Sequence, residues 1–206
     1  MTETPPPPER KVYSSKIVHA AMERLRVAFH PHVAKFGFVR TTSRMWVRRH
    51  EFTADWFALR RVGSINNYSV EPLLEAGIHV MNAPGGLPLN APTHREAVLH
   101  FRDARYHHRF NASSNSMFDR TVADLVRYFD DVQEPWFQRF ATVDALLDAP
   151  DRDYELPGLQ LDAALTPEEK AYLMDGLEHG IAAERLAASL KLLCIKTPKA
   201  KRTSRA

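Results

Sequence analysis

The first strong pattern in the chain is a stripe of apolar residues at helical spacing. Its members, separated by three or four positions, are Val18, Met22, Leu25, Phe29, Val33 and Phe36. Residues at this spacing share one face of an α-helix, so the stripe predicts a helix over residues 14–36 that buries this face. Ser14 or Ser15 can cap the start of the helix, and Gly37 can end it because glycine readily adopts the left-handed conformation.

An alternating pattern, typical of β-strands, follows over residues 39–62. In the first strand Met45 and Val47 point to one face, and Arg44, Trp46 and Arg48 point to the other. The pattern predicts two strands joined near residues 50–53. A third strand is expected within 70–81 and a fourth at 105–110, with a loop rich in proline and glycine at 82–93 between them.

A second apolar stripe at helical spacing predicts a helix over residues 117–131. Its members are Phe118, Val122, Leu125 and Phe129. The densest aromatic segment of the chain, EPWFQRF at 134–140, comes directly after this helix. Pro135 suits the first position of a short helix, and we expect Trp136 and Phe140 to be buried in the fold rather than to line a ligand site.

The composition changes in the last quarter of the chain. Residues 151–165 are acidic and poor in large apolar side chains, which is typical of a linker. Residues 166–195 then predict two helices in a hairpin. The first of these begins with the signature of a capping box, in which Thr166 caps the helix and Glu169 reaches back to it.

Together these patterns predict an α+β fold. We expect a small, mostly antiparallel sheet of about four strands, packed on one face by the N-terminal helix and by the later 117–131 helix, with the C-terminal helical hairpin appended. The expected organisation is a disordered proline-rich N-terminus at 1–12, an α+β domain at 13–150, a linker at 151–165, the hairpin at 166–195 and a disordered basic tail at 196–206.

The charge of the chain is unevenly distributed, although its sequence pI is about 9.1. Residues 196–206 hold five lysines and arginines and no acidic residue, and without them 23 basic residues face 25 acidic ones, a net charge of −2. A domain that binds nucleic acid usually carries positive charge on its folded surface. We therefore expect only weak, non-specific contact between the tail and nucleic acid.

The cysteine content and the absence of apolar runs indicate a cytoplasmic protein. Cys194 is the single cysteine, so an intrachain disulfide is excluded, as is usual in a reducing compartment. We expect neither a signal peptide nor a membrane span, because the N-terminal segment has no apolar core and no long apolar run occurs. Cys194 is expected to be a small buried apolar side chain. A nucleophilic role would instead need positive neighbours, such as Lys191 and Lys196.

No local motif of an enzyme or of a cofactor site occurs in the sequence: it has no G-x-S-x-G, no P-loop and no G-x-G-x-x-G. Ten histidines are present, but the pairs His30/His32 and His107/His108 have the wrong spacing to share one metal ion on a helix or strand. We therefore expect no metal and no cofactor. The same absence favours a non-enzymatic role, and an enzyme without a local motif is the alternative.

The polar surface best suited to a ligand is the predicted strand pair. Arg44, Trp46 and Arg48 share one face of the first strand, and Arg60 could join them from the second. Arginine beside tryptophan can stack on bases and can pair with phosphate or carboxylate groups. The alternative is structural, with Trp46 packed in the fold and the arginine stems lying along apolar surface. These four residues are the candidate ligand-binding site.

The order of these features resembles that of a known family. The shared features are Gly37-Phe38 after the first helix, an aromatic strand pair, the strand EAGIHV at 75–80, Arg109-Phe110 at the end of a short strand, and a helix that leads to the Pro/Trp/Phe segment. Over about residues 14–148 this layout resembles an uncharacterised bacterial family, domain of unknown function 4304. The chain departs from that family in INNYSVEP at 65–72, which lacks a Gln-Lys-Ser stretch, and in its extra C-terminal helices. The resemblance implies a small α+β domain and no catalytic residues.

The leading functional prediction is a non-enzymatic cytoplasmic domain that binds an unidentified protein partner. It rests on the missing motifs, the near-neutral body and the added helical hairpin. One alternative is a nucleic-acid-binding protein that uses the Arg44/Trp46/Arg48 face and the basic tail. The other is an enzyme whose histidines and arginines meet only in the folded structure.

Overall fold

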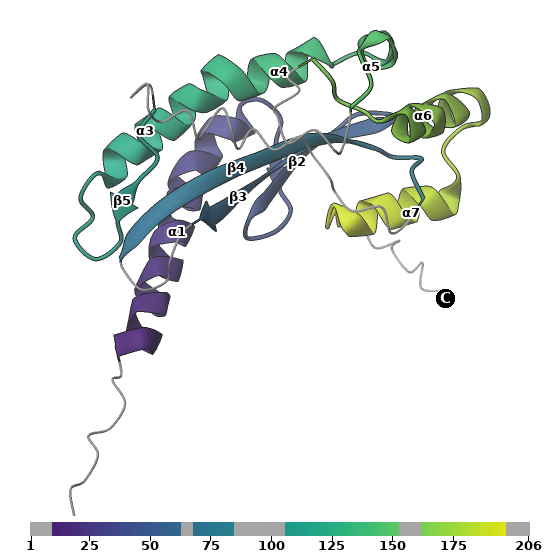
Figure 1. Cartoon of the computed structure of the whole chain (residues 1–206). Coiled ribbons are helices and arrows are strands. Elements are labelled where there is room, and N and C mark those ends of the chain that lie inside the picture. The colour runs from purple at the N-terminus through teal and green to yellow at the C-terminus, as the bar shows by residue number, and fades with distance from the viewer. Residues whose placement is uncertain (1–9, 63–67, 85–105, 153–161, 197–206) are drawn as a thin grey trace, which may run out of the picture.

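The structure is a computed structural model, and it describes residues 10–62, 68–84, 106–152 and 162–196. It has an α+β fold in which helices lie on both sides of one sheet (Figure 1). The predicted proline-rich start and basic tail lie outside the described residues, except that the first helix already begins at Arg10 and Lys196 is described. Most of the predicted 82–93 loop and 151–165 linker also lies outside them.

Helix α1 spans Arg10–Ala34 and confirms the predicted N-terminal helix, with an earlier start. Its apolar stripe is buried as expected: Val18, Met22, Leu25, Phe29 and Val33 all belong to the main core. Pro31 lies within the last turn of α1 and is exposed, so its ring faces solvent rather than the core. Gly37 then turns the chain towards the sheet with a φ of 86°, a left-handed conformation that glycine adopts without steric cost.

The sheet has five strands in sequence order, β1-β2-β3-β4-β5, and all neighbours are antiparallel. The strands are β1 Val39–Arg40, β2 Met45–Arg49, β3 Thr53–Val62, β4 Ser69–Val80 and β5 Phe110–Asn111. The first three predicted strand regions are confirmed. The fourth is shorter and later than expected, because Tyr106 to Arg109 form no ladder with the sheet.

The register of β2 and β3 decides which side chains share a face. Trp46 lies opposite Phe57, and Met45 lies opposite Ala58. Directly paired residues point to the same face of a sheet, so Trp46 and Phe57 enter the main core while Met45 and Ala58 enter a second cluster on the other face. β3 is therefore apolar on both faces over most of its length, which requires helices on both sides.

One helical layer covers the face of the sheet that carries Trp46. It contains α1 and the run α3 Phe118–Tyr128, η2 Phe129–Gln133, α4 Glu134–Arg139 and α5 Val143–Asp148. The predicted helix over 117–131 is confirmed. Met117 precedes the helix with a φ of 68° and makes no side-chain capping bond. The five residues of η2 form a π-helix that joins α3 to α4, where Pro135 stands in the first turn.

The C-terminal helices are α6, Pro167–His179, and α7, Ala183–Leu192. The capping box of Thr166 and Glu169 is present as predicted. α7 packs Leu190 and Leu193 against the second face of the sheet, where Met45, Val47, Ala54, Trp56, Ala58 and Met81 complete a separate apolar cluster. The sequence predicted the hairpin but left open whether it packs on the sheet, and the structure places α7 on the second face. The sheet needs α7 because its second face also carries apolar side chains that would otherwise meet water.

The segment EPWFQRF belongs to the core, as predicted. Trp136 is 4% exposed, Phe137 is fully buried and Phe140 is 3% exposed. The Trp136 ring meets the rings of Phe137 and Phe140 edge to face, with a centroid distance of 5.3 Å in each pair. Glu134 at the start of the segment is also buried and pairs with Arg48 across the helix–sheet interface. The segment therefore fastens α4 to the sheet.

None of the described helices is long and apolar enough to span a lipid bilayer.

Candidate functional site

The predicted binding face of β2 is covered by the helical layer. Arg44, Trp46 and Arg48 share one face, as the alternation predicts, but Trp46 is fully buried. Its ring stacks on Phe57 at a centroid distance of 5.1 Å and an interplanar angle of 10°. The indole Nε1 donates a hydrogen bond to Nδ1 of His30 at 3.1 Å. Trp46 therefore offers no surface on which a base could stack, and the structural interpretation of this residue holds.

Arg48 is also committed to the fold. Its Nε donates to Oδ2 of Asp55 and its Nη1 to Oε1 of Glu134, each at 2.8 Å, and the side chain is 14% exposed. Burial alone would lower the pKa of Arg48, but the hydrogen bonds and charges of Glu134 and Asp55 outweigh it and raise the pKa. The guanidinium also lies over the ring of Phe38, 4.5 Å from its centroid. The arginine is thus a buried electrostatic link between sheet and helix.

The other two predicted residues, Arg44 and Arg60, meet in an open hollow. Because Met45 pairs with Ala58, Arg60 belongs to the strand face opposite Trp46. Arg44 comes just before β2 and Arg60 lies near the end of β3, and both line the same hollow where these strands reach α1. The sequence therefore identified two residues of a real surface feature, although it predicted a different face for them.

We call this hollow the arginine groove and define it by Val18, His19, Met22, Arg26, Ser43, Arg44, Arg60 and Arg61. Its volume is about 600 Å³, within the range of ligand sites in proteins. Helix α1 supplies one wall, and the segments around β2 and β3 supply the other. Four arginines line it, and no carboxylate is among its lining residues in the described part of the chain.

Arg26 is the structural centre of the arginine groove. It is 9% exposed, and its Nη2 donates to the carbonyl oxygen of Leu59 at 3.1 Å, which joins α1 to β3. Burial lowers the pKa of Arg26, and the positive charges of Arg40 and Arg44 add to this effect against the opposing charge of Glu23. Burial is thus the main cause of the lowered pKa, and the two neighbouring arginines act in the same direction.

The carboxylates near the arginine groove hold individual arginines in place. Oε2 of Glu75 lies 2.6 Å from Nε of Arg60, and Oε2 of Glu23 lies 3.7 Å from Nη1 of Arg26. Arg44 takes part in no ion pair within the described residues and is exposed. Its guanidinium is therefore well placed to bind an incoming anion, because no ion pair within the described residues has to be broken first.

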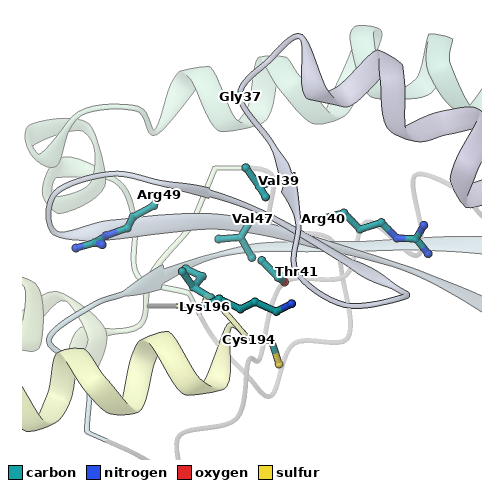
Figure 2. Close-up of a pocket in the computed structure, with 9 residues that line it drawn as sticks. Gly37, Val39, Arg40, Thr41, Val47, Arg49, Cys194 and Lys196 are labelled. Atoms are coloured by element: carbon teal, nitrogen blue, oxygen red, sulfur yellow. The ribbon is translucent and has the colours of Figure 1, made fainter. Parts of the chain in front are cut away.

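A second hollow lies beside the edge strand β1, and we call it the edge pocket. Its volume is about 350 Å³, and it is lined by Gly37, Val39, Arg40, Thr41, Val47, Arg49, Cys194, Ile195 and Lys196. Figure 2 shows that these residues come from the β1–β2 edge and from the segment after α7. The Arg40 and Arg49 side chains extend from it in opposite directions, while Lys196 reaches towards Thr41 (Figure 2).

The prediction that Cys194 is a buried apolar side chain is wrong, because Cys194 is exposed. Helix α7 ends at Leu192, and Cys194 adopts a φ of 53° just beyond it. Leu193 and Ile195 on either side turn towards the apolar cluster under the sheet, so the thiol is left on the outside. Because Cys194 is exposed and lines the edge pocket, its thiol is accessible to reagents in solution.

The histidine pairs considered in the sequence serve separate contacts. His30 accepts from Trp46, whereas Nε2 of His32 lies 2.6 Å from Oδ1 of Asp130. His108 is buried and its ring meets the Tyr128 ring edge-on, while His107 is partly exposed. Among the described residues no group of three or more His, Cys, Asp or Glu side chains is arranged to hold a metal ion.

Sequence reasoning missed Arg26, Arg61 and His19 as members of the arginine groove. A signal for Arg26 was present, because it stands four residues after Met22 on the apolar stripe of α1. A charged residue on a stripe that faces the core must either pair with another group or reach solvent through a hollow. Arg61 and His19 gave no comparable signal. Their proximity depends on how α1 packs beside the end of β3, and local sequence patterns do not show that packing.

No family model, curated protein or solved structure matches this chain. The resemblance to the family of domain of unknown function 4304 therefore stays a prediction, which this result neither supports nor contradicts.

Proposed function

We propose that this protein is a non-enzymatic binding module that recognises an anionic segment of a protein partner through the arginine groove. The observation that carries the proposal is the convergence of four arginines on one concave surface whose described lining residues include no carboxylate. Guanidinium groups bind carboxylate and phosphate with two parallel hydrogen bonds, which gives both energy and orientation.

The protonation chemistry of the arginine groove supports binding rather than catalysis. Arginine side chains stay protonated at neutral pH, so they stabilise negative charge but do not exchange protons with a substrate. His19 could exchange a proton, but its Nδ1 lies 2.9 Å from the carbonyl oxygen of Ser15 on the same helix. The groove is thus equipped to hold an anion.

The shape of the arginine groove supports a protein partner rather than nucleic acid. Its apolar lining consists of Val18 and Met22, and its described lining residues include no tryptophan, tyrosine or phenylalanine on which a base could stack. Trp46, the expected stacking residue, lies in the core. The chain without residues 196–206 has a net charge of −2, which does not favour the long polyanion of a nucleic acid.

The proposal is tested with a short fluorescein-labelled peptide rich in glutamate that carries one central phosphoserine. Fluorescence anisotropy at low salt measures its affinity for the full chain. Arg44→Glu reverses a charge that makes no ion pair within the described residues, so we expect normal folding and a roughly tenfold or greater loss of affinity.

Arg49→Glu is the matched control, because Arg49 is also an exposed arginine and lines the edge pocket instead. We expect this variant to bind the peptide like the unmodified protein. Equal weakening by both variants would show diffuse attraction and overturn the proposal. Tighter binding of a single-stranded oligonucleotide than of the peptide, retained after deletion of residues 197–206, would favour the nucleic-acid alternative.

A further inference from the structure

The edge pocket has an apolar side that belongs to the sheet and to the C-terminal segment. Val47 is buried, Ile195 packs partly against the second apolar cluster, and Val39 is 64% exposed on the edge strand. Val39 pairs directly with Val47 in the β1–β2 ladder, so both side chains point to the same face of the sheet. An apolar group of a ligand would remove the exposed Val39 surface from water.

The polar side of the edge pocket is positively charged. Lys196 and Arg49 line it, both are exposed, and neither takes part in an ion pair within the described residues. Arg40 contributes only its stem, because its Nη2 is bound to both carboxylate oxygens of Glu23 at 2.8 Å. No acidic residue is among the lining residues of the edge pocket in the described chain.

Thr41 adds a hydrogen-bonding group to the wall of the edge pocket. Its backbone nitrogen donates to the carbonyl oxygen of Met45, but its hydroxyl oxygen is buried and has no hydrogen-bond partner among the described residues. Buried polar groups in folded proteins are normally paired, so an unused hydroxyl in the wall of a hollow calls for an explanation. A ligand oxygen that accepted its proton would supply the missing bond.

We propose that the edge pocket binds a small amphipathic monocarboxylate. The hydrocarbon part lies against Val39, Val47 and Ile195, and the carboxylate pairs with the Lys196 ammonium and accepts from the Thr41 hydroxyl. Arg49 adds long-range attraction at the rim. The volume of about 350 Å³ suits a compact ligand of this kind and excludes a long folded chain. The site is separate from the arginine groove and shares no lining residue with it.

Cys194 provides a direct readout of this site, because it lines the edge pocket and is the single cysteine of the chain. Iodoacetamide, which is uncharged, alkylates the exposed thiol, and intact mass spectrometry gives the rate. Hexanoate is the probe, and hexanol and hexylammonium are its neutral and cationic counterparts. We expect hexanoate to slow alkylation in a saturable way, and the two counterparts to act far more weakly.

Two variants separate the carboxylate contacts from general effects. Lys196→Glu should weaken hexanoate protection roughly tenfold, because one attractive charge becomes repulsive. Thr41→Val keeps the shape of the side chain and removes the hydroxyl, so it should weaken protection without lowering the stability of the fold. Lys191→Glu is the control, since Lys191 is exposed on α7 and does not line the edge pocket.

Each variant is compared with itself in the presence and absence of hexanoate, so a change in the intrinsic reactivity of the thiol cancels. Chemical-shift changes at the backbone amide of Gly37 give an independent measure of binding. Unchanged alkylation and unchanged amide shifts with hexanoate would overturn the proposal. Equal protection by hexylammonium, or protection that Lys196→Glu and Lys191→Glu reduce equally, would overturn it as well. Peptide binding at the arginine groove is unaffected by any of these outcomes.

Discussion

At the scale of single residues, burial decides what an arginine does in this protein. Arg44 lies just before β2 and Arg48 lies within it, and their positions in the alternating pattern assign both to the side of Trp46. Even so, Arg48 binds two carboxylates, whereas Arg44 is exposed and makes no ion pair in the described chain. The difference comes from position along the strand. Arg48 lies under α4, which brings Glu134 to it, while Arg44 lies at the open end beside α1.

Replacing these two arginines by alanine should therefore affect stability to very different extents. Arg48→Ala leaves the buried Asp55 and Glu134 without the positive charge of the arginine, and we expect it to lower the free energy of unfolding by roughly 3–5 kcal/mol. Arg44→Ala removes an exposed side chain and should change it by about 0.5 kcal/mol or less. Urea denaturation followed by tryptophan fluorescence measures both. Equal losses for the two variants would show that the Arg48 contacts do not stabilise the fold.

At the scale of elements, α7 is fastened to the sheet by a polar clamp as well as by its leucines. The buried His79 on β4 lies with its Nε2 2.9 Å from Oγ of Ser189 on α7, and Ser189 donates onward to the carbonyl oxygen of Met81 at 3.0 Å. Since Ser189 donates to the carbonyl, it accepts the proton of neutral His79. A positive charge on His79 would have no carboxylate partner in this clamp.

The clamp predicts how stability depends on pH. Burial lowers the pKa of His79 to about 4, whereas the unfolded chain has an ordinary histidine pKa. Between these values the unfolded state binds more protons, so stability is complete above about pH 6.5 and falls as pH decreases towards 4. The loss is roughly 3 kcal/mol for this one group. Burial lowers the pKa of His108 too, which adds a change in the same direction.

Substitution isolates the contribution of His79. We expect His79→Gln, which keeps a hydrogen-bond donor to Ser189, to be less dependent on pH between 4 and 6.5 than the unmodified protein. His19→Gln on the exposed side of α1 serves as the control and should keep the original pH profile. Denaturation curves at several pH values measure both variants, and an identical slope for His79→Gln and the unmodified protein would show that His79 does not carry the effect.

At the scale of the whole molecule, the sheet is the middle layer of the described fold. Its two faces carry separate apolar clusters, one under α1, α3 and α4 and the other under α7 (Figure 1). Asn82, just after β4, binds both C-terminal helices: its Nδ2 donates to the carbonyl oxygen of Tyr172, and its Oδ1 accepts from the backbone of Ala182. The hairpin and the sheet are therefore expected to unfold together.

Leu193→Ala tests this cooperation. Leu193 is fully buried in the second cluster, so its truncation should lower the stability of the whole fold by about 2–5 kcal/mol in a single transition. Fluorescence of the tryptophans and far-UV circular dichroism should give the same midpoint. Met174→Ala on the exposed side of α6 is the control and should have little effect. Separate transitions for hairpin and sheet would contradict the expectation.

Local patterns determined the elements of this protein. The spacing from Val18 to Val33 predicted α1 and its buried face, the alternation around Trp46 predicted β2, and Thr166 with Glu169 predicted the start of α6. Each of these rests on interactions between near neighbours, whose geometry is fixed by the period of a helix or a strand. The burial of Trp136 and Phe140 followed in the same way, because a dense aromatic segment has few places other than a core.

Only the tertiary structure decided which helices cover each face of the sheet. The same alternation that placed Trp46 with Arg44 and Arg48 could not show that α1 and α4 lie over that face, and so the expected ligand face became core. Nor could it show that α7 packs on the other face, leaving Cys194 exposed. The two hollows arise where segments far apart in sequence meet, α1 with the end of β3 and the β1 edge with the end of α7. The composition and the hydrophobic periodicity of a segment describe that segment by itself. A binding site, in contrast, is a hollow between packed segments, so its position depends on how those segments pack.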